Sequence, residues 1–173
     1  MAMPAKKKGL SVGEMALFGV LGALTFGLKL VMAPLPNIEP VSLLVMVYAV
    51  VFRWKSLYPV YLYVLMEVLY FGLGTWNFNY LYIWGILVVA SVLLAETRHP
   101  LVWAVLSGAF GLLFGLFCAP VDIFIGGLGY AVTKWASGIP FDVLHCTGNF
   151  AMALLLFVPL RNLLTKLYSK MRA

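Results

Sequence analysis

Long, nearly uncharged apolar runs constrain the fold of this chain more than any other feature. Several of them reach the ~20 residues with which a helix crosses ~30 Å of hydrocarbon. Only 10% of the 173 residues are charged, whereas a soluble domain carries roughly 25% charged residues. The strands of a membrane barrel would alternate apolar and polar residues over about ten positions, and the sequence lacks this alternation. We therefore expect an all-α integral membrane protein.

The apolar runs predict six transmembrane helices that form a single domain over residues 1–173. The second run is short for a span, and the fifth contains Pro120, which we expect to kink or end that helix. The basic N-terminal segment, 1–12, resembles the start of a signal peptide. The run after it is too long and lacks a cleavage site before Pro34, so we expect a retained first helix. The six spans lie near 14–33, 41–53, 57–75, 78–96, 101–126 and 141–160.

The distribution of charge predicts the orientation of these helices. In a six-span arrangement the loops near 34–40, 75–79 and 127–140 share one side, where Lys134 is the only basic residue. Because cytoplasmic segments carry an excess of Lys and Arg, both termini are expected in the cytoplasm of a bacterial cell. The net charge of +6 then reflects topology and needs no nucleic-acid partner. The basic residues on the cytoplasmic side are Lys6, Lys7, Lys8, Arg53, Lys55 and Arg98, with Arg161, Lys166, Lys170 and Arg172 in the C-terminal segment 161–173.

A proline-rich segment, 33–40, separates the first two apolar runs. It contains three prolines together with Asn37 and Glu39. Proline fixes φ and donates no backbone hydrogen bond, so this segment cannot be helical throughout. A short, stiff, polar connection at the outer face predicts a cap over a cavity.

The first helix carries a strip of small residues, Gly19, Ala23 and Gly27, at four-residue spacing. Such a strip lets another helix approach closely, which favours helix association in lipid. The strip could pack within the protein's own bundle, or it could dock onto a partner membrane protein.

Aromatic and amide side chains are concentrated between residues 72 and 84. Trp76, Tyr80 and Trp84 recur at helical spacing, with Asn77 and Asn79 between them. Trp and Tyr favour membrane interfaces in any case. Rings and amides together also suit a flat heteroaromatic or amphipathic ligand.

Asp142, His145 and Asn149 lie on one face of the last expected span. Asp142 follows Pro140 and could cap a helix that begins there. The group could also form a structural hydrogen-bonded pair, contact a ligand, relay protons or supply half a metal site. A metal site needs further ligands with suitable spacing, and none is visible, so we expect no metal.

Two cysteines outside any metal-binding or redox pattern, Cys118 and Cys146, are interpreted as buried packing thiols.

Two charges lie inside expected spans, where they are costly unless paired. Lys29 and Glu67 both fall in the outer halves of their helices, so they could form an ion pair between the first and third helices or contribute to ligand recognition. Asp122, just after Pro120, is expected at the outer rim, lining or closing a cavity.

No P-loop, nucleophile elbow or HExxH motif is present, so the sequence predicts no ATPase or other enzyme activity of its own.

These features resemble the substrate-binding S-components of energy-coupling factor (ECF) transporters. The resemblance is carried by the small-residue strip, the segment 35–40, the aromatic segment 76–84, and Phe141–His145 followed by Gly148 and Asn149. It implies a binding subunit that captures a vitamin under the loop after the first helix. It also implies two kinds of partner, a transmembrane scaffold subunit and two cytoplasmic ATPases. The small residues of the first helix contact the scaffold in that family, where the strip is usually alanine-rich; here two of its three positions are glycine.

Taken as a whole, the sequence resembles most the cobalamin-type S-components of lactobacilli. The expected ligand is therefore cobalamin or a smaller aromatic vitamin. We consider two rival functions. One is an ion-coupled secondary transporter that uses Lys29, Glu67 and Asp122. The other is a membrane enzyme built on Asp142 and His145. The predicted substrate-binding residues are Asn37, Glu39, Trp76, Asn77, Asn79, Tyr80, Trp84, Asp142, His145 and Asn149.

Overall fold

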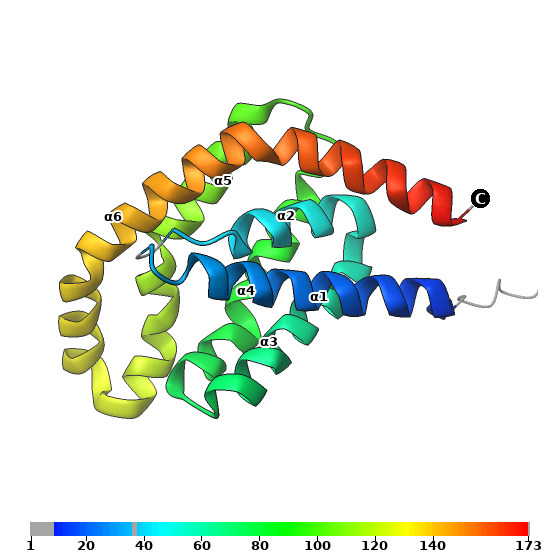
Figure 1. The fold of residues 1–173 in the computed structure, drawn as a ribbon. Helices are drawn as coiled ribbons and strands as arrows, with labels where there is room; N and C mark the ends of the chain where they lie inside the picture. Colours follow the sequence, from blue (N-terminus) through cyan, green and yellow to red (C-terminus); the bar gives the residue numbers. More distant parts are fainter. Residues whose placement is uncertain (1–8, 36–37, 173) are drawn as a thin grey trace, which may run out of the picture.

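The computed structural model describes residues 9–35 and 38–172, and in this part of the chain all regular structure is helical (Figure 1). The predicted all-α fold is therefore confirmed. Pro36 and Asn37, in the proline-rich segment, lie outside the described residues, as do the N-terminal lysines Lys6–Lys8. The elements are α1 (Val12–Met32), α2 (Val41–Phe52), the 3₁₀ helix η1 (Arg53–Ser56), α3 (Leu57–Phe71), α4 (Thr75–Leu93), α5 (Pro100–Leu112) and α6 (Phe114–Arg172).

Four helical stretches are long and apolar enough to cross a membrane: Val12–Met32, Val41–Phe71, Thr75–Leu93 and Pro100–Arg172. The second stretch reverses direction at Arg53, whose φ of 55° is the one positive value among the described non-glycine residues. A membrane protein with several spanning helices is consistent with this composition and length. The count of six spans and the cytoplasmic placement of the termini stay predictions.

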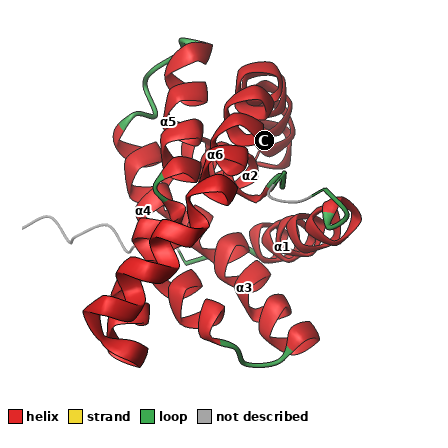
Figure 2. Cartoon of the chain, turned by 90° about the vertical axis from the view of Figure 1, so that its left-hand side faces the viewer, coloured by secondary structure: helices red, strands yellow, loops and turns green. Residues whose placement is uncertain are grey.

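Helix α2 explains why the second apolar run is so short. It lies near the middle of the bundle and packs against α4 and α6 (Figure 2). Every residue from Val41 to Ala49 is buried. A helix enclosed by other helices is not obliged to match the thickness of the hydrocarbon, because its ends contact protein rather than lipid. The short run therefore forms a core helix.

The start of α1 is set by a capping box. The Ser11 hydroxyl accepts a hydrogen bond from the Glu14 N–H at 3.1 Å, and the Glu14 carboxylate accepts one from the Ser11 N–H at 3.1 Å. These contacts satisfy amide donors that a helix start leaves unpaired. At its other end α1 stops at Met32, two residues before Pro34, and the described part of the proline-rich segment is not helical, as expected.

The end of the chain departs from the prediction, because no new helix begins after Pro140. Pro120 and Pro140 both lie inside α6, and the chain breaks instead at Gly127, with φ of 78° and ψ of 177°. Only glycine adopts this conformation readily. Prolines are tolerated in membrane helices where neighbouring groups satisfy the freed carbonyls. Asp142 therefore lies well inside a helix and does not cap one that begins at Pro140.

Glycines allow the closest helix contacts of the bundle. A Cβ atom on Gly111 of α5 would lie 2.8 Å from the backbone carbonyl of His145 in α6. On Gly22 of α1 it would lie 2.9 Å from the Cβ atom of Leu62 in α3. These positions leave no room for a side chain, so the backbones meet directly. The first contact fixes the part of α6 that carries His145.

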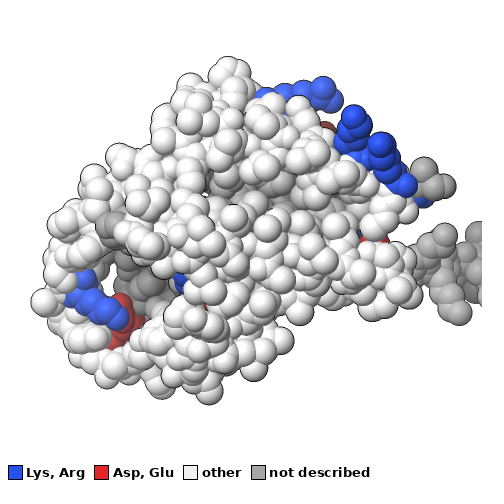
Figure 3. Space-filling view, viewed as in Figure 1, with Lys and Arg blue, Asp and Glu red and all other residues white. Residues whose placement is uncertain are grey.

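The two ends of the molecule differ in charge. Chain ends 9–11 and 171–172 lie close together, and the Glu14 carboxylate accepts hydrogen bonds from Lys55 and Tyr168, each at 2.6 Å. Figure 3 shows Lys and Arg gathered at this end, whereas at the opposite end a basic and an acidic group lie beside a hollow. The residues of the basic end are Arg53, Lys55, Arg98, Arg161, Lys166, Lys170 and Arg172.

Candidate functional site

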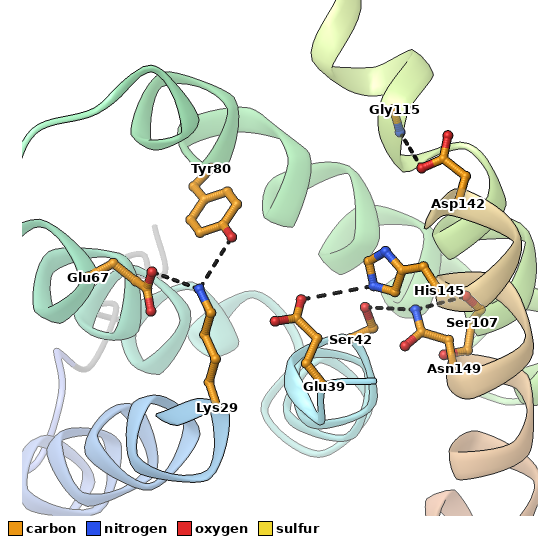
Figure 4. A network of polar contacts seen from close by, with 10 residues as sticks. All are labelled: Lys29, Glu39, Ser42, Glu67, Tyr80, Ser107, Gly115, Asp142, His145 and Asn149. Carbon is orange, nitrogen blue, oxygen red and sulfur yellow. Dashed lines mark hydrogen bonds and ion pairs between the residues drawn. The ribbon is translucent and has the colours of Figure 1, made fainter. Parts of the chain in front are cut away.

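A cavity of about 330 Å³, which we call the central cavity, lies beneath the proline-rich segment. Its walls come from the end of α1, from the segment between α1 and α2, from α4, and from two separate parts of α6. Most of the polar side chains around it converge in Figure 4. The lining residues are Lys29, Met32, Ala33, Leu35, Ile38, Glu39, Tyr80, Phe114, Asp142 and His145.

Lys29 is held by an ion pair on one side of the central cavity. Its ammonium lies 2.7 Å from Glu67 Oε2 and donates a second, longer hydrogen bond to the Tyr80 hydroxyl at 3.4 Å. The Glu67 side chain is 1% exposed and that of Lys29 is 20% exposed. Of the two roles left open for these charges, the structure forms the ion pair between α1 and α3. Because the pair neutralises both charges, Lys29 brings little free positive charge to the cavity.

Glu39 reaches the cavity from the segment between α1 and α2. Its Oε1 lies 3.9 Å from His145 Nε2, which is too long for a hydrogen bond. Burial raises the pKa of the Glu39 carboxyl above its ordinary value of 4.5, while the charge of Lys29 acts in the opposite direction. A residue of the predicted cap thus lines the cavity.

Asp142 and His145 enter the cavity from adjacent turns of α6. Asp142 Oδ1 accepts a hydrogen bond from the Gly115 N–H at 3.2 Å, in the first turn of α6, where amide groups lack helical partners. Among the described residues neither Asp142 Oδ2 nor His145 Nε2 has a hydrogen-bond partner, although both atoms are buried. The His145 ring lies 5.1 Å from that of Phe114. Unpaired buried polar atoms that border a cavity are suited to bind a ligand.

Asn149, predicted on the same face, belongs to the core. Its side-chain amide donates to Ser42 Oγ at 3.1 Å and to the Ser107 carbonyl at 3.4 Å, which ties α6 to α2 and α5. Asn149 does not line the central cavity. The i, i+3, i+7 pattern identified the face of the helix, but it could not show how deep the cavity extends along that face.

The aromatic segment is divided among three roles. Tyr80 lines the central cavity. Trp84 is fully buried and packs against Tyr63 at a ring distance of 6.1 Å. Asn77 accepts a hydrogen bond from the Gly74 N–H at 2.7 Å and thereby caps α4. Trp84 and Asn77 line neither cavity described here; they support the start of α4 and the core beneath it.

Trp76 and Asn79 line a second cavity of about 430 Å³, which we call the rim cavity. Asp122 and Lys134 form an ion pair of 2.6 Å in its wall, so Asp122 lies at a cavity as predicted. Gly115 also lines the rim cavity, and its contact with Asp142 forms part of the wall between the two cavities. The residues of the rim cavity are Thr75, Trp76, Asn79, Gly115, Cys118, Asp122, Lys134, Trp135 and Gly138.

Sequence reasoning missed several residues of these sites, among them Phe114, Trp135 and Lys134 as the partner of Asp122. Phe114 lies within an apolar run and carries no distinguishing pattern. Lys134 was visible as the single basic residue of its loop, and this isolation was a usable signal that it pairs with a nearby acid. The pairing depends on the turn at Gly127, which brings the two parts of α6 together.

The comparisons with known proteins identify no relative. The chain shows no significant similarity to a protein-family model, to a characterised protein or to a solved structure.

Within residues 9–35 and 38–172, no group of three or more His, Cys, Asp and Glu is placed to hold a metal ion. Cys118 and Cys146 are free thiols, each partly buried.

Proposed function

We propose that this protein is the substrate-specific binding subunit, or S-component, of an ECF-type importer that takes up a vitamin or related micronutrient. The observation that carries the proposal is the central cavity beneath the proline-rich segment, where buried polar atoms of Asp142 and His145 lack partners in the described part of the chain. The cavity lies away from the basic end of the chain. By the positive-inside rule, that cavity end would face outward.

The cavity volumes favour a small organic ligand. Sites for small molecules typically measure about 300–1,000 Å³, and the central and rim cavities measure about 330 and 430 Å³. Either one suits a vitamin built of one or two rings. A corrinoid such as cobalamin is several times larger, so its binding would require the two cavities to merge through movement at the Gly115–Asp142 contact.

The surface of α1 supports the proposed partner, a transmembrane scaffold subunit that is energised by two ATPases. Gly19 and Ala23 are exposed, and Gly27 is partly exposed. Added Cβ atoms at Gly19 and Gly27 would meet nothing within 4 Å in the described structure, whereas Gly22 packs against α3. Small residues thus lie on two different faces of α1. Gly22 packs inside the protein's own bundle, and the strip Gly19, Ala23 and Gly27 remains available to another helix.

Reconstitution tests the proposal directly. Proteoliposomes that contain this chain alone should bind the ligand without accumulating it, and accumulation should require the scaffold and ATP-hydrolysing subunits. Uptake by the chain alone that depends on an ion gradient would contradict the proposal. It would support instead a secondary transporter that uses Lys29, Glu67 and Asp122.

A further inference from the structure

Two carboxyl groups, one lysine and one histidine line the central cavity, together with the Tyr80 hydroxyl. Its one Lys, Lys29, is already paired with Glu67 at 2.7 Å. The two carboxyl groups are those of Glu39 and Asp142. Among the described residues Asp142 has no cationic partner within 4 Å, and Glu39 has only the titratable His145, at 3.9 Å. When these carboxyls are ionised, the described lining residues therefore carry a net negative charge.

The Asp142 side chain is buried and held in position at this site. The residue is 7% exposed; Oδ1 accepts from the Gly115 N–H, and Oδ2 has no partner within residues 9–35 and 38–172. An uncompensated carboxylate in a low-dielectric setting is costly, and it is neutralised by a proton or by a cation. A group that is positioned by one oxygen and open at the other suits a ligand that donates to it.

We infer that the central cavity binds an organic cation, with its charged nitrogen facing the carboxyls that Glu39 and Asp142 contribute to the lining. This inference rests on the proposed function and specifies the class of ligand. Phe114 lines the same cavity, and aromatic faces attract cations and stack on flat rings. The Tyr80 ring also lines it, but the Lys29 ammonium already lies 5.3 Å from the centre of that ring. The ligand class is thus a compact, positively charged nitrogen compound, preferably aromatic.

The inference predicts a pH dependence with a defined sign. Burial raises the pKa of Glu39, so its carboxyl becomes neutral at a higher pH than an exposed glutamate and then attracts a cation less. Binding of a permanently charged cation should therefore weaken as the pH falls, with release of protons on binding at mildly acidic pH. The titratable and charged groups that face Glu39 from the surrounding helices are Lys29, Tyr63, Glu67, Tyr80, Asp142 and His145.

A matched set of three probes tests the inference. 1-Methylnicotinamide carries a permanent positive charge, nicotinamide is neutral and nicotinate is an anion, and all three share one pyridine ring. Isothermal titration calorimetry of the full chain in detergent should show the tightest binding for the cation and the weakest for the anion. Glu39→Gln and Asp142→Asn should each weaken cation binding by about tenfold. Unfolding midpoints in detergent close to that of the wild type would report that both variants fold. Glu96→Gln, at an exposed position on the basic end, is the matched control and should bind like the wild type.

Tighter binding of nicotinamide or nicotinate than of the cation would overturn the ligand class and leave the proposed binding function standing. Equal binding of all three probes, or of the cation to wild type and acid variants, would overturn it as well. Absence of binding by every probe at millimolar concentration would also overturn the cation inference. The proposed function would then be decided by the small molecules that the purified protein itself releases on denaturation.

Discussion

At the scale of single residues, charge pairing decides what each polar group of the membrane domain can do. The sequence showed Lys29 and Glu67 as two costly charges, and the structure joins them at 2.7 Å. Among the described residues Glu39 and Asp142 have no Lys or Arg within 4 Å, which makes them the groups available to a ligand. Pairing thus separates structural charges from the charges that a ligand can use.

The first prediction concerns the Lys29–Glu67 pair. Lys29→Met leaves the carboxylate of Glu67, which is 1% exposed, without its counter-charge, and should lower the stability to unfolding by about 2–4 kcal/mol. The measurement is the midpoint of unfolding in detergent. Adding Glu67→Gln to this variant should recover most of the loss. Lys166→Met, at an exposed position, is the control; an equal loss in single and double variants would contradict the assigned role.

At the scale of elements, helix packing through glycine positions the site. Gly111 brings α5 against the backbone of α6 at His145, and Gly127 turns α6 back so that Lys134 reaches Asp122. The side chains of both cavities depend on these two features.

Our second prediction compares two glycine substitutions. Gly111→Ala places a Cβ atom 2.8 Å from the His145 carbonyl, so α5 and α6 must separate, at a cost of about 1–3 kcal/mol. In Gly129→Ala the new Cβ meets nothing within 4 Å, and helix propensity should raise the stability by up to about 1 kcal/mol. Unfolding midpoints of the two purified variants provide the measurement. Equal effects of the two substitutions would argue against the close approach at Gly111.

Helix positions could be predicted where the local sequence pattern determines them. Predictions failed where packing between helices determines a helix end or the depth of a side chain. Apolar runs and the proline-rich segment gave the positions of α1, α2 and α4 to within a few residues. Pro140 looked like a helix start, but Gly127 carries the break, because a proline inside a membrane helix can be accommodated by its neighbours. Trp84 and Asn149 share helical faces with cavity residues yet lie in the core, and their depth depends on which helices cover them.

At the scale of the whole molecule, charge is segregated between two ends. The basic end contains both described chain ends, which Glu14 helps to hold together through Lys55 and Tyr168. The cavities lie toward the other end, where Asp122 pairs with Lys134. If the basic end is cytoplasmic, the cavities face outward, as a binding subunit of an importer requires.

The third prediction tests this orientation by labelling cysteines in intact cells. In a background with Cys118→Ala and Cys146→Ala, a Ser137→Cys variant should react with a membrane-impermeant thiol reagent. Ser169→Cys should react only after the cells are permeabilised. Both serines are exposed and lie on opposite parts of α6. The reverse pattern would place the basic end outside and contradict the proposed direction of transport.

The most direct test of the central claim is the identification of small molecules bound to the purified protein. Mass spectrometry after denaturation should detect one vitamin-sized compound in near-equal proportion to the wild-type chain. The same compound should be largely lost from Tyr80→Ala, whose side chain lines the central cavity. It should be retained by Trp54→Ala, an exposed residue in η1 at the basic end. No enriched compound, or one retained equally by both variants, would contradict the assignment of the central cavity as the ligand site.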